Sequence, residues 1–183
     1  MKPAKINVLS IGAFVILTYC QPKEDLSVVQ QELTTFQTEW LESGSAIRQT
    51  LDSLKNDNQV LHDLLVKMKK IKDAGTSKAN FDSLYVSVNN LKDSLGVELK
   101  NFNTLTNNWN QHKANLNQLV TAVESKSITA AEANEKLSEL KNIRTSAMNE
   151  LSDLQRVRDA YATSLKAYST KFEKDFPKNI TGV

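Results

Sequence analysis

The sequence predicts an all-α protein, an elongated antiparallel three-helix coiled-coil bundle whose helices run up, down and up. No proline lies between Lys23 and Phe176, so no ring interrupts a helix in that stretch. Apolar residues there recur at alternating steps of three and four, the period of helices that pack along a seam. The same stretch holds only three glycines, far fewer turn residues than a β-rich chain needs. The bundle is expected over residues 25–176, with a short tail at 177–183.

The first helix is expected over residues 25–73. It should end at Gly75, because glycine readily adopts the positive φ that follows a helix C-terminus. Ser77 is then placed to cap the next helix. The apolar seam positions of this first helix are Leu26, Val29, Leu33, Phe36, Trp40, Ile47, Leu51, Leu54, Leu61, Leu65 and Met68.

The second and third helices are expected over residues 78–124 and 130–175. Thr129 and Glu132 match a capping box, in which the Thr hydroxyl accepts the N3 amide and the Glu side chain reaches back. The seam of the second helix holds Phe81, Leu84, Val88, Leu91, Leu95, Leu99, Phe102, Trp109, Leu116, Val120 and Val123. The seam of the third holds Leu137, Leu140, Arg144, Ala147, Leu151, Leu154, Arg158, Tyr161, Leu165, Tyr168 and Phe172.

The three helices have similar lengths, roughly 70 Å each at 1.5 Å per residue. Two short loops require neighbouring helices to run antiparallel. Side chains fill the seam of such a bundle, so it offers little width for an enclosed pocket.

Antiparallel pairing also predicts which residues lie at one level. For two antiparallel helices joined by a loop, the numbers of residues at the same level add to a constant, about 151 for the first loop and about 254 for the second. Trp40, Trp109, Arg144 and Ala147 are therefore expected in one layer or in neighbouring layers. Ala147 would leave room for two indoles, and Arg144 could lie over one of them as a cation–π contact.

The same arithmetic places Arg158 beside Gly96, where a missing side chain would admit the guanidinium. Asp52, Asp57 and Glu98 are its candidate partners. For both seam arginines three interpretations stay open: a long side chain that extends to water, a buried charge that fixes helix register, or a ligand contact.

The chain begins with a short leader. Lys2 and Lys5 precede an apolar run from Ile6 to Leu17, a pattern typical of a secretory signal. The run is too short to span a bilayer, which needs about 20 apolar residues. Residues 1–19 are therefore expected to be a signal peptide.

The only cysteine of the chain, Cys20, follows this run. Leu17-Thr18-Tyr19-Cys20 resembles the lipobox of bacterial lipoproteins, although Tyr19 stands where that motif normally has a small residue. The resemblance implies that Cys20 is acylated, for example by palmitate, and begins the mature chain, with residues 20–24 as a short tether. Gln21, in place of an aspartate, implies the outer membrane. The alternative is an ordinary signal peptide with Cys20 an incidental thiol.

Charge argues against a nucleic-acid partner. Loss of Lys2 and Lys5 with the leader lowers the Lys and Arg count from 23 to 21, equal to the 21 Asp and Glu. A neutral mature chain has no electrostatic attraction to phosphate backbones.

We found no sequence pattern that predicts catalysis, a metal site or a cofactor. The two histidines, His62 and His112, fall at different levels of the predicted bundle and have no partners at metal-ligand spacing. The sequence holds no P-loop, GxSxG or HExxH motif. We therefore expect a protein that is not an enzyme.

Two polar features remain as candidate binding surfaces. An asparagine cluster on the second helix is either a neutral solvated face or a hydrogen-bonding surface for a glycan or peptide; it comprises Asn101, Asn103, Asn107, Asn108, Asn110, Asn115 and Asn117. Lysines gather at the end of the bundle away from Cys20, where they either complement helix dipoles or form a basic tip for an anionic partner. The residues of this basic tip are Lys67, Lys69, Lys70, Lys72, Lys78, Lys171 and Lys174.

Together these features favour a lipid-anchored helical protein of the bacterial cell envelope that acts as a spacer, tether or scaffold. Its partners would be the membrane, through the lipid on Cys20, and an envelope polymer or protein. The alternative is a surface-exposed lipoprotein that binds a protein or glycan through a helical face or the basic tip. The unbroken heptad pattern of the third helix also allows a homo-oligomer.

Overall fold

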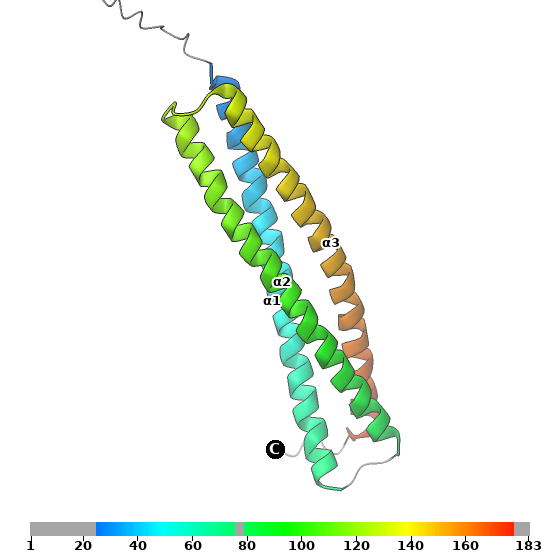
Figure 1. Cartoon of the computed structure of the whole chain (residues 1–183). Coiled ribbons are helices and arrows are strands. Elements are labelled where there is room, and N and C mark those ends of the chain that lie inside the picture. Colours follow the sequence, from blue (N-terminus) through cyan, green and yellow to red (C-terminus); the bar gives the residue numbers. More distant parts are fainter. Residues whose placement is uncertain (1–24, 76–78, 178–183) are drawn as a thin grey trace, which may run out of the picture.

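The computed structural model describes residues 25–75 and 79–177 as one elongated three-helix bundle (Figure 1). Helix α1 spans Ser27–Asp73, α2 spans Ala79–Glu124 and α3 spans Ala130–Asp175. The chain runs along the rod three times, so that α1 and α3 are parallel and α2 is antiparallel to both. The predicted all-α, up-down-up bundle is therefore confirmed, and each helix begins and ends within two residues of the range expected. Cys20, Ser77 and Lys78 lie outside the described residues.

Local signals in the sequence account for the helix ends. Gly75 has φ of 66° and donates its N–H to the Lys72 carbonyl, which closes the end of α1. Before α3, the Thr129 hydroxyl accepts the Glu132 N–H at 3.2 Å, and the Thr129 N–H donates to the Glu132 carboxylate at 3.1 Å. The predicted capping box is thus present.

The end of α2 uses a less favourable residue. The Ser127 N–H donates to the Ala122 carbonyl and the Lys126 N–H to the Val123 carbonyl, the bonding pattern of a Schellman motif. Lys126 takes the position where glycine is preferred, with φ of 56°. A residue with a Cβ is strained in that left-handed conformation.

Apolar side chains fill the seam along the whole rod. The largest fully buried ones are Trp40, Phe36, Phe81, Phe102 and Phe172. Each helix touches both others, so its buried stripe is wider than two positions per heptad. This width explains why leucine and isoleucine residues outside the expected seam are buried, namely Leu64, Ile71, Leu105 and Leu119.

The two tryptophans form the predicted layer. The rings of Trp40 and Trp109 are stacked, with centroids 3.9 Å apart and planes 17° apart. Ala147 is buried as well. Gly44 lies directly against this pair, because a Cβ built on Gly44 would be 2.8 Å from the Trp109 Nε1. The missing side chain of Gly44 thus makes room for an indole.

Arg144 lies at the predicted level, against two residues that flank Trp40, but its expected cation–π contact is wrong. Its guanidinium does not lie over an indole: Nε donates to the Ser43 Oγ at 2.9 Å, and Nη1 lies 3.4 Å from a Glu39 carboxylate oxygen. One face of each indole is covered by the other ring, and Ser43 and Glu39 offer stronger acceptors than a ring.

The expected pairing of Arg158 with Gly96 is also wrong. Gly96 is exposed, and a Cβ built on it would meet nothing within 4 Å. Arg158 instead extends from α3 towards α1, where its Nε donates to the Asp57 Oδ2 at 2.9 Å. Of its three candidate partners, Asp57 is the one it contacts.

Candidate functional site

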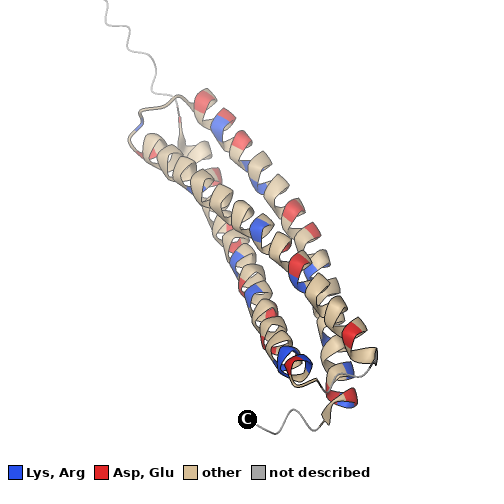
Figure 2. Ribbon diagram, turned by 60° about the horizontal axis from the view of Figure 1, so that its bottom comes forward, with Lys and Arg blue, Asp and Glu red and all other residues tan. Residues whose placement is uncertain are grey.

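The first candidate site is the basic tip, at the end of the rod where α1 and α3 end and α2 begins (Figure 1). Its six described lysines, Lys67, Lys69, Lys70, Lys72, Lys171 and Lys174, are all exposed. Blue and red segments alternate at this end in Figure 2. Five acidic residues share it: Asp63, Asp73, Asp82, Glu173 and Asp175. The tip is therefore a mixed surface with a small positive excess.

The lysines at the end of α1 do not share one face. At 100° per residue, the side chains of Lys67, Lys69, Lys70 and Lys72 leave the helix in four directions. Lys72 lies over the Tyr85 ring of α2, with its Nζ 4.7 Å from the centroid, as a cation–π contact. Of these four lysines, Lys70 lies most nearly opposite the buried stripe of α1.

A second candidate site is a row of polar bridges that joins the parallel helices α1 and α3. It comprises the ion pair of Glu32 with Lys141, the contacts of Arg144 described above, a hydrogen bond from the Gln155 Nε2 to the Thr50 Oγ1 at 3.0 Å, and the pair of Asp57 with Arg158. The sequence predicted the two arginines and Asp57, but not the roles of Ser43 and Thr50 on α1. A signal was present, because Ser43, Thr50 and Asp57 stand seven residues apart at one heptad position.

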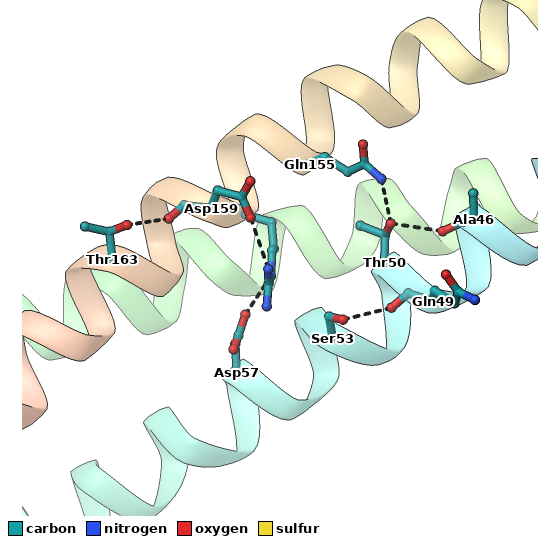
Figure 3. A network of polar contacts seen from close by, with 9 residues as sticks. Ala46, Gln49, Thr50, Ser53, Asp57, Gln155, Asp159 and Thr163 are labelled. Atoms are coloured by element: carbon teal, nitrogen blue, oxygen red, sulfur yellow. Dashed lines mark hydrogen bonds and ion pairs between the residues drawn. The ribbon is translucent and has the colours of Figure 1, made fainter.

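Figure 3 shows the lower part of this row. Asp57 of α1 and Asp159 of α3 lie on either side of the Arg158 guanidinium, each with a hydrogen bond. Burial alone lowers the pKa of Arg158, but the bonds to Asp159 and Asp57 and the attraction of Asp57 outweigh it and raise the pKa above its ordinary value. Arg158 therefore stays charged, and the bridge joins α3 to α1 without offering a titrating group.

Two hollows of the surface are grooves between helices. The groove between α2 and α3, of about 450 Å³, has an apolar floor of Leu119 and Leu140. The groove between α1 and α3 beside Arg158, of about 310 Å³, is lined mainly by polar side chains, including Gln49 and Gln155. No catalytic pair of acid and base converges in either groove.

The histidines are far from forming a site. His62 is exposed, and His112 is partly buried with an Nδ1 that has no hydrogen-bond partner among the described residues. In residues 25–75 and 79–177, no three His, Cys, Asp or Glu side chains gather in a way that could hold a metal ion. Nor does any helix in this part of the chain have the length and apolar character needed to cross a membrane.

The asparagine cluster lies entirely on the surface of α2. All seven of its members are exposed. The Asn101 side chain donates to the Glu98 carboxylate at 3.2 Å, while the side chains of the others have no hydrogen-bond partner within the described residues. The amides are therefore open to water or to a partner molecule.

Comparison with known proteins adds no relative: no family model, no curated protein and no solved structure matches this chain.

Proposed function

We propose that this protein is a non-enzymatic, lipid-anchored helical protein of the bacterial cell envelope, in which the bundle acts as a spacer, tether or scaffold. The observation that carries the proposal is the shape of the bundle, a filled rod roughly 70 Å long with α1 starting at one end. A rod of this kind offers surface and length rather than an interior for chemistry.

The sequence before α1 supports an anchor at that end. The Leu17–Cys20 segment resembles a lipobox, and only four residues lie between Cys20 and Asp25. The five steps from Cys20 to Asp25 span at most about 18 Å, so an acylated Cys20 would hold the base of the rod close to the membrane. Gln21 favours the outer membrane as the location. The opposite end would then stand away from the bilayer.

Membrane fractionation of the full chain in a diderm bacterial host tests the anchor. Wild type should incorporate radiolabelled palmitate and sediment with the membranes, whereas Cys20→Ser should do neither. Tyr19→Ala restores a small residue before the cysteine and should increase labelling. If Cys20→Ser remains in the membrane fraction as wild type does, acylation is not the anchor and the proposal fails.

A second candidate function is binding of an anionic envelope polymer or protein through the basic tip. The exposed Lys69, Lys70 and Lys174 favour it, since they are held at the end furthest from the proposed anchor. A glycan bound along the asparagine cluster is the other form of this candidate.

A matched pair of triple variants tests the tip. Changing Lys69, Lys70 and Lys174 to Gln should weaken retention on an immobilised anionic polysaccharide. The control changes Lys113, Lys126 and Lys136 to Gln, which removes the same charge from exposed positions elsewhere. Equal loss in both variants would mean that only net charge matters, and the tip would not be a site.

A further inference from the structure

The outer face of α2 is unlike the rest of the rod surface. No Asp or Glu occurs from Leu99 to Val123, and the only charged residues there are Lys100 and Lys113. At 100° per residue, six exposed amide side chains of this segment fall within an arc of about 120°. We call them the amide face: Asn103, Asn107, Asn110, Gln111, Asn117 and Gln118.

The amide face has unused hydrogen-bonding capacity. None of its six side chains has a hydrogen-bond partner within the described part of the chain. Ala114, which is exposed, lies at the centre of the arc, so the middle of the face is free of bulk. The face runs from residue 103 to 118, about 22 Å along the rod.

An uncharged amide surface has a particular consequence for pairing. When two parallel copies of a helix meet about a two-fold axis along their length, each residue lies at the level of its own copy. A charged residue would then face its own charge. An amide both donates and accepts, so it can pair with itself, as asparagines do within parallel coiled coils.

The other two helices lack such a face at this level. Trp40 stacks on Trp109, so this part of α2 lies beside the first half of α1, where Glu39, Glu42 and Arg48 lie. The corresponding part of α3 carries several charges of both signs, among them Lys136, Glu139 and Glu150. Self-pairing in parallel would oppose like charges on either of those helices, but not on the amide face.

We propose that the amide face of α2 is a self-association surface, on which a second copy of this chain packs in parallel. The parallel orientation rests on the proposed function, because chains anchored at the same end in one membrane stand side by side at the same height. Confinement to the membrane also raises the effective concentration, which lets a polar interface of modest affinity form.

Cysteine crosslinking in the intact envelope tests the proposal. In the full chain, Ala114→Cys places a thiol at the centre of the amide face, where two parallel copies would bring it beside itself. We expect a disulfide-linked dimer on a non-reducing gel. The matched control Asn142→Cys, on the exposed surface of α3, should stay monomeric. Equal dimer yields from the two variants would mean random collision and would overturn the proposal.

A charge variant then tests the amides themselves. In the Ala114→Cys background, Asn107, Asn110 and Asn117 are changed to Asp, which opposes like charges at three levels and should lower the dimer yield by more than about fivefold. The control changes Asn134, Asn142 and Asn149 of α3 to Asp, adding the same charge elsewhere. An unchanged yield in the first variant would refute the role of the amide face, once circular dichroism confirms its helical content.

Fractionation of the same cells separates this proposal from the function on which it rests. Membrane-bound chains that give no Ala114→Cys dimer would overturn the self-association and leave the anchor standing. Soluble chains that still give the dimer would overturn the anchor and leave the self-association standing.

Discussion

The contact of Gly44 with Trp109 predicts that α1 has glycine at position 44 because a larger side chain would collide with the indole. Replacing a glycine in a helix interior by alanine normally raises the free energy of unfolding by about 1 kcal/mol. At Gly44 the new Cβ would lie 2.8 Å from the Trp109 Nε1, closer than a carbon atom normally approaches. The indole of Trp109 is 6% exposed and stacked on Trp40, so it cannot move away without disturbing the layer.

Overpacking of this kind costs about 1–3 kcal/mol. Set against the gain in helix propensity, Gly44→Ala should lower the free energy of unfolding by about 1 kcal/mol. Gly96→Ala is the matched control, because Gly96 also lies inside a helix but has open space around it. Gly96→Ala should raise the free energy of unfolding by about 1 kcal/mol. The two variants should therefore differ by about 2 kcal/mol.

Urea denaturation followed by circular dichroism measures both values. Wild type, Gly44→Ala and Gly96→Ala should have midpoints in the order Gly96→Ala, wild type, Gly44→Ala, from highest to lowest. A midpoint for Gly44→Ala as high as that of Gly96→Ala would refute the close contact. Trp109→Phe provides a further check, because a smaller ring should remove most of the difference between Gly and Ala at position 44.

Three further predictions concern the helix ends and the polar bridges. Lys126→Gly should raise the free energy of unfolding by about 1 kcal/mol, because glycine relieves the positive φ at the end of α2; a lower urea midpoint would contradict this. Asp57→Ala and Arg158→Ala should be less than additive, with a coupling of about 1 kcal/mol in a double-mutant cycle; additive losses would mean that the pair is not coupled. Hydrogen bonds from the N–H and hydroxyl of Thr129 lower the pKa of Glu132 below its ordinary 4.5, so the carboxylate stabilises the fold above that pH and loses this effect as the pH falls. Glu132→Gln should therefore make the free energy of unfolding fall less steeply on acidification. Parallel curves of unfolding free energy against pH for the two proteins would refute this.

The features that the sequence could predict are local or periodic. The capping box is a pattern of four adjacent residues, from Thr129 to Glu132, and its geometry needs no distant partner. The tryptophan layer follows from counting back from each loop, because antiparallel helices of regular rise keep level residues together.

The sequence could not predict how side chains turn within a layer. Counting placed Gly96 near Arg158 in height, but Gly96 lies on the outside of α2 and Arg158 turns to Asp57 of α1. Arg144 likewise donates a hydrogen bond to Ser43 and does not lie over an indole. A small rotation about a helix axis decides which neighbour a long side chain reaches, and the apolar period fixes that rotation only loosely.

Candidate sites were harder to predict for a related reason. A bundle whose seam is filled puts its polar side chains on the outside, where spacing alone does not distinguish a binding surface from a solvated one. The amide face stands out only when its position on α2 is compared with the charged surfaces of the other two helices at the same level.

The number of helices has a consequence for how this rod could measure distance. Three passes along the bundle put the start of α1 and the end of α3 at opposite ends, whereas two or four would return the chain to its origin (Figure 1). Adding one heptad to every helix would push those ends apart by about 10 Å without changing the packing pattern. The distance between the two ends of the rod can thus be changed in steps of seven residues per helix.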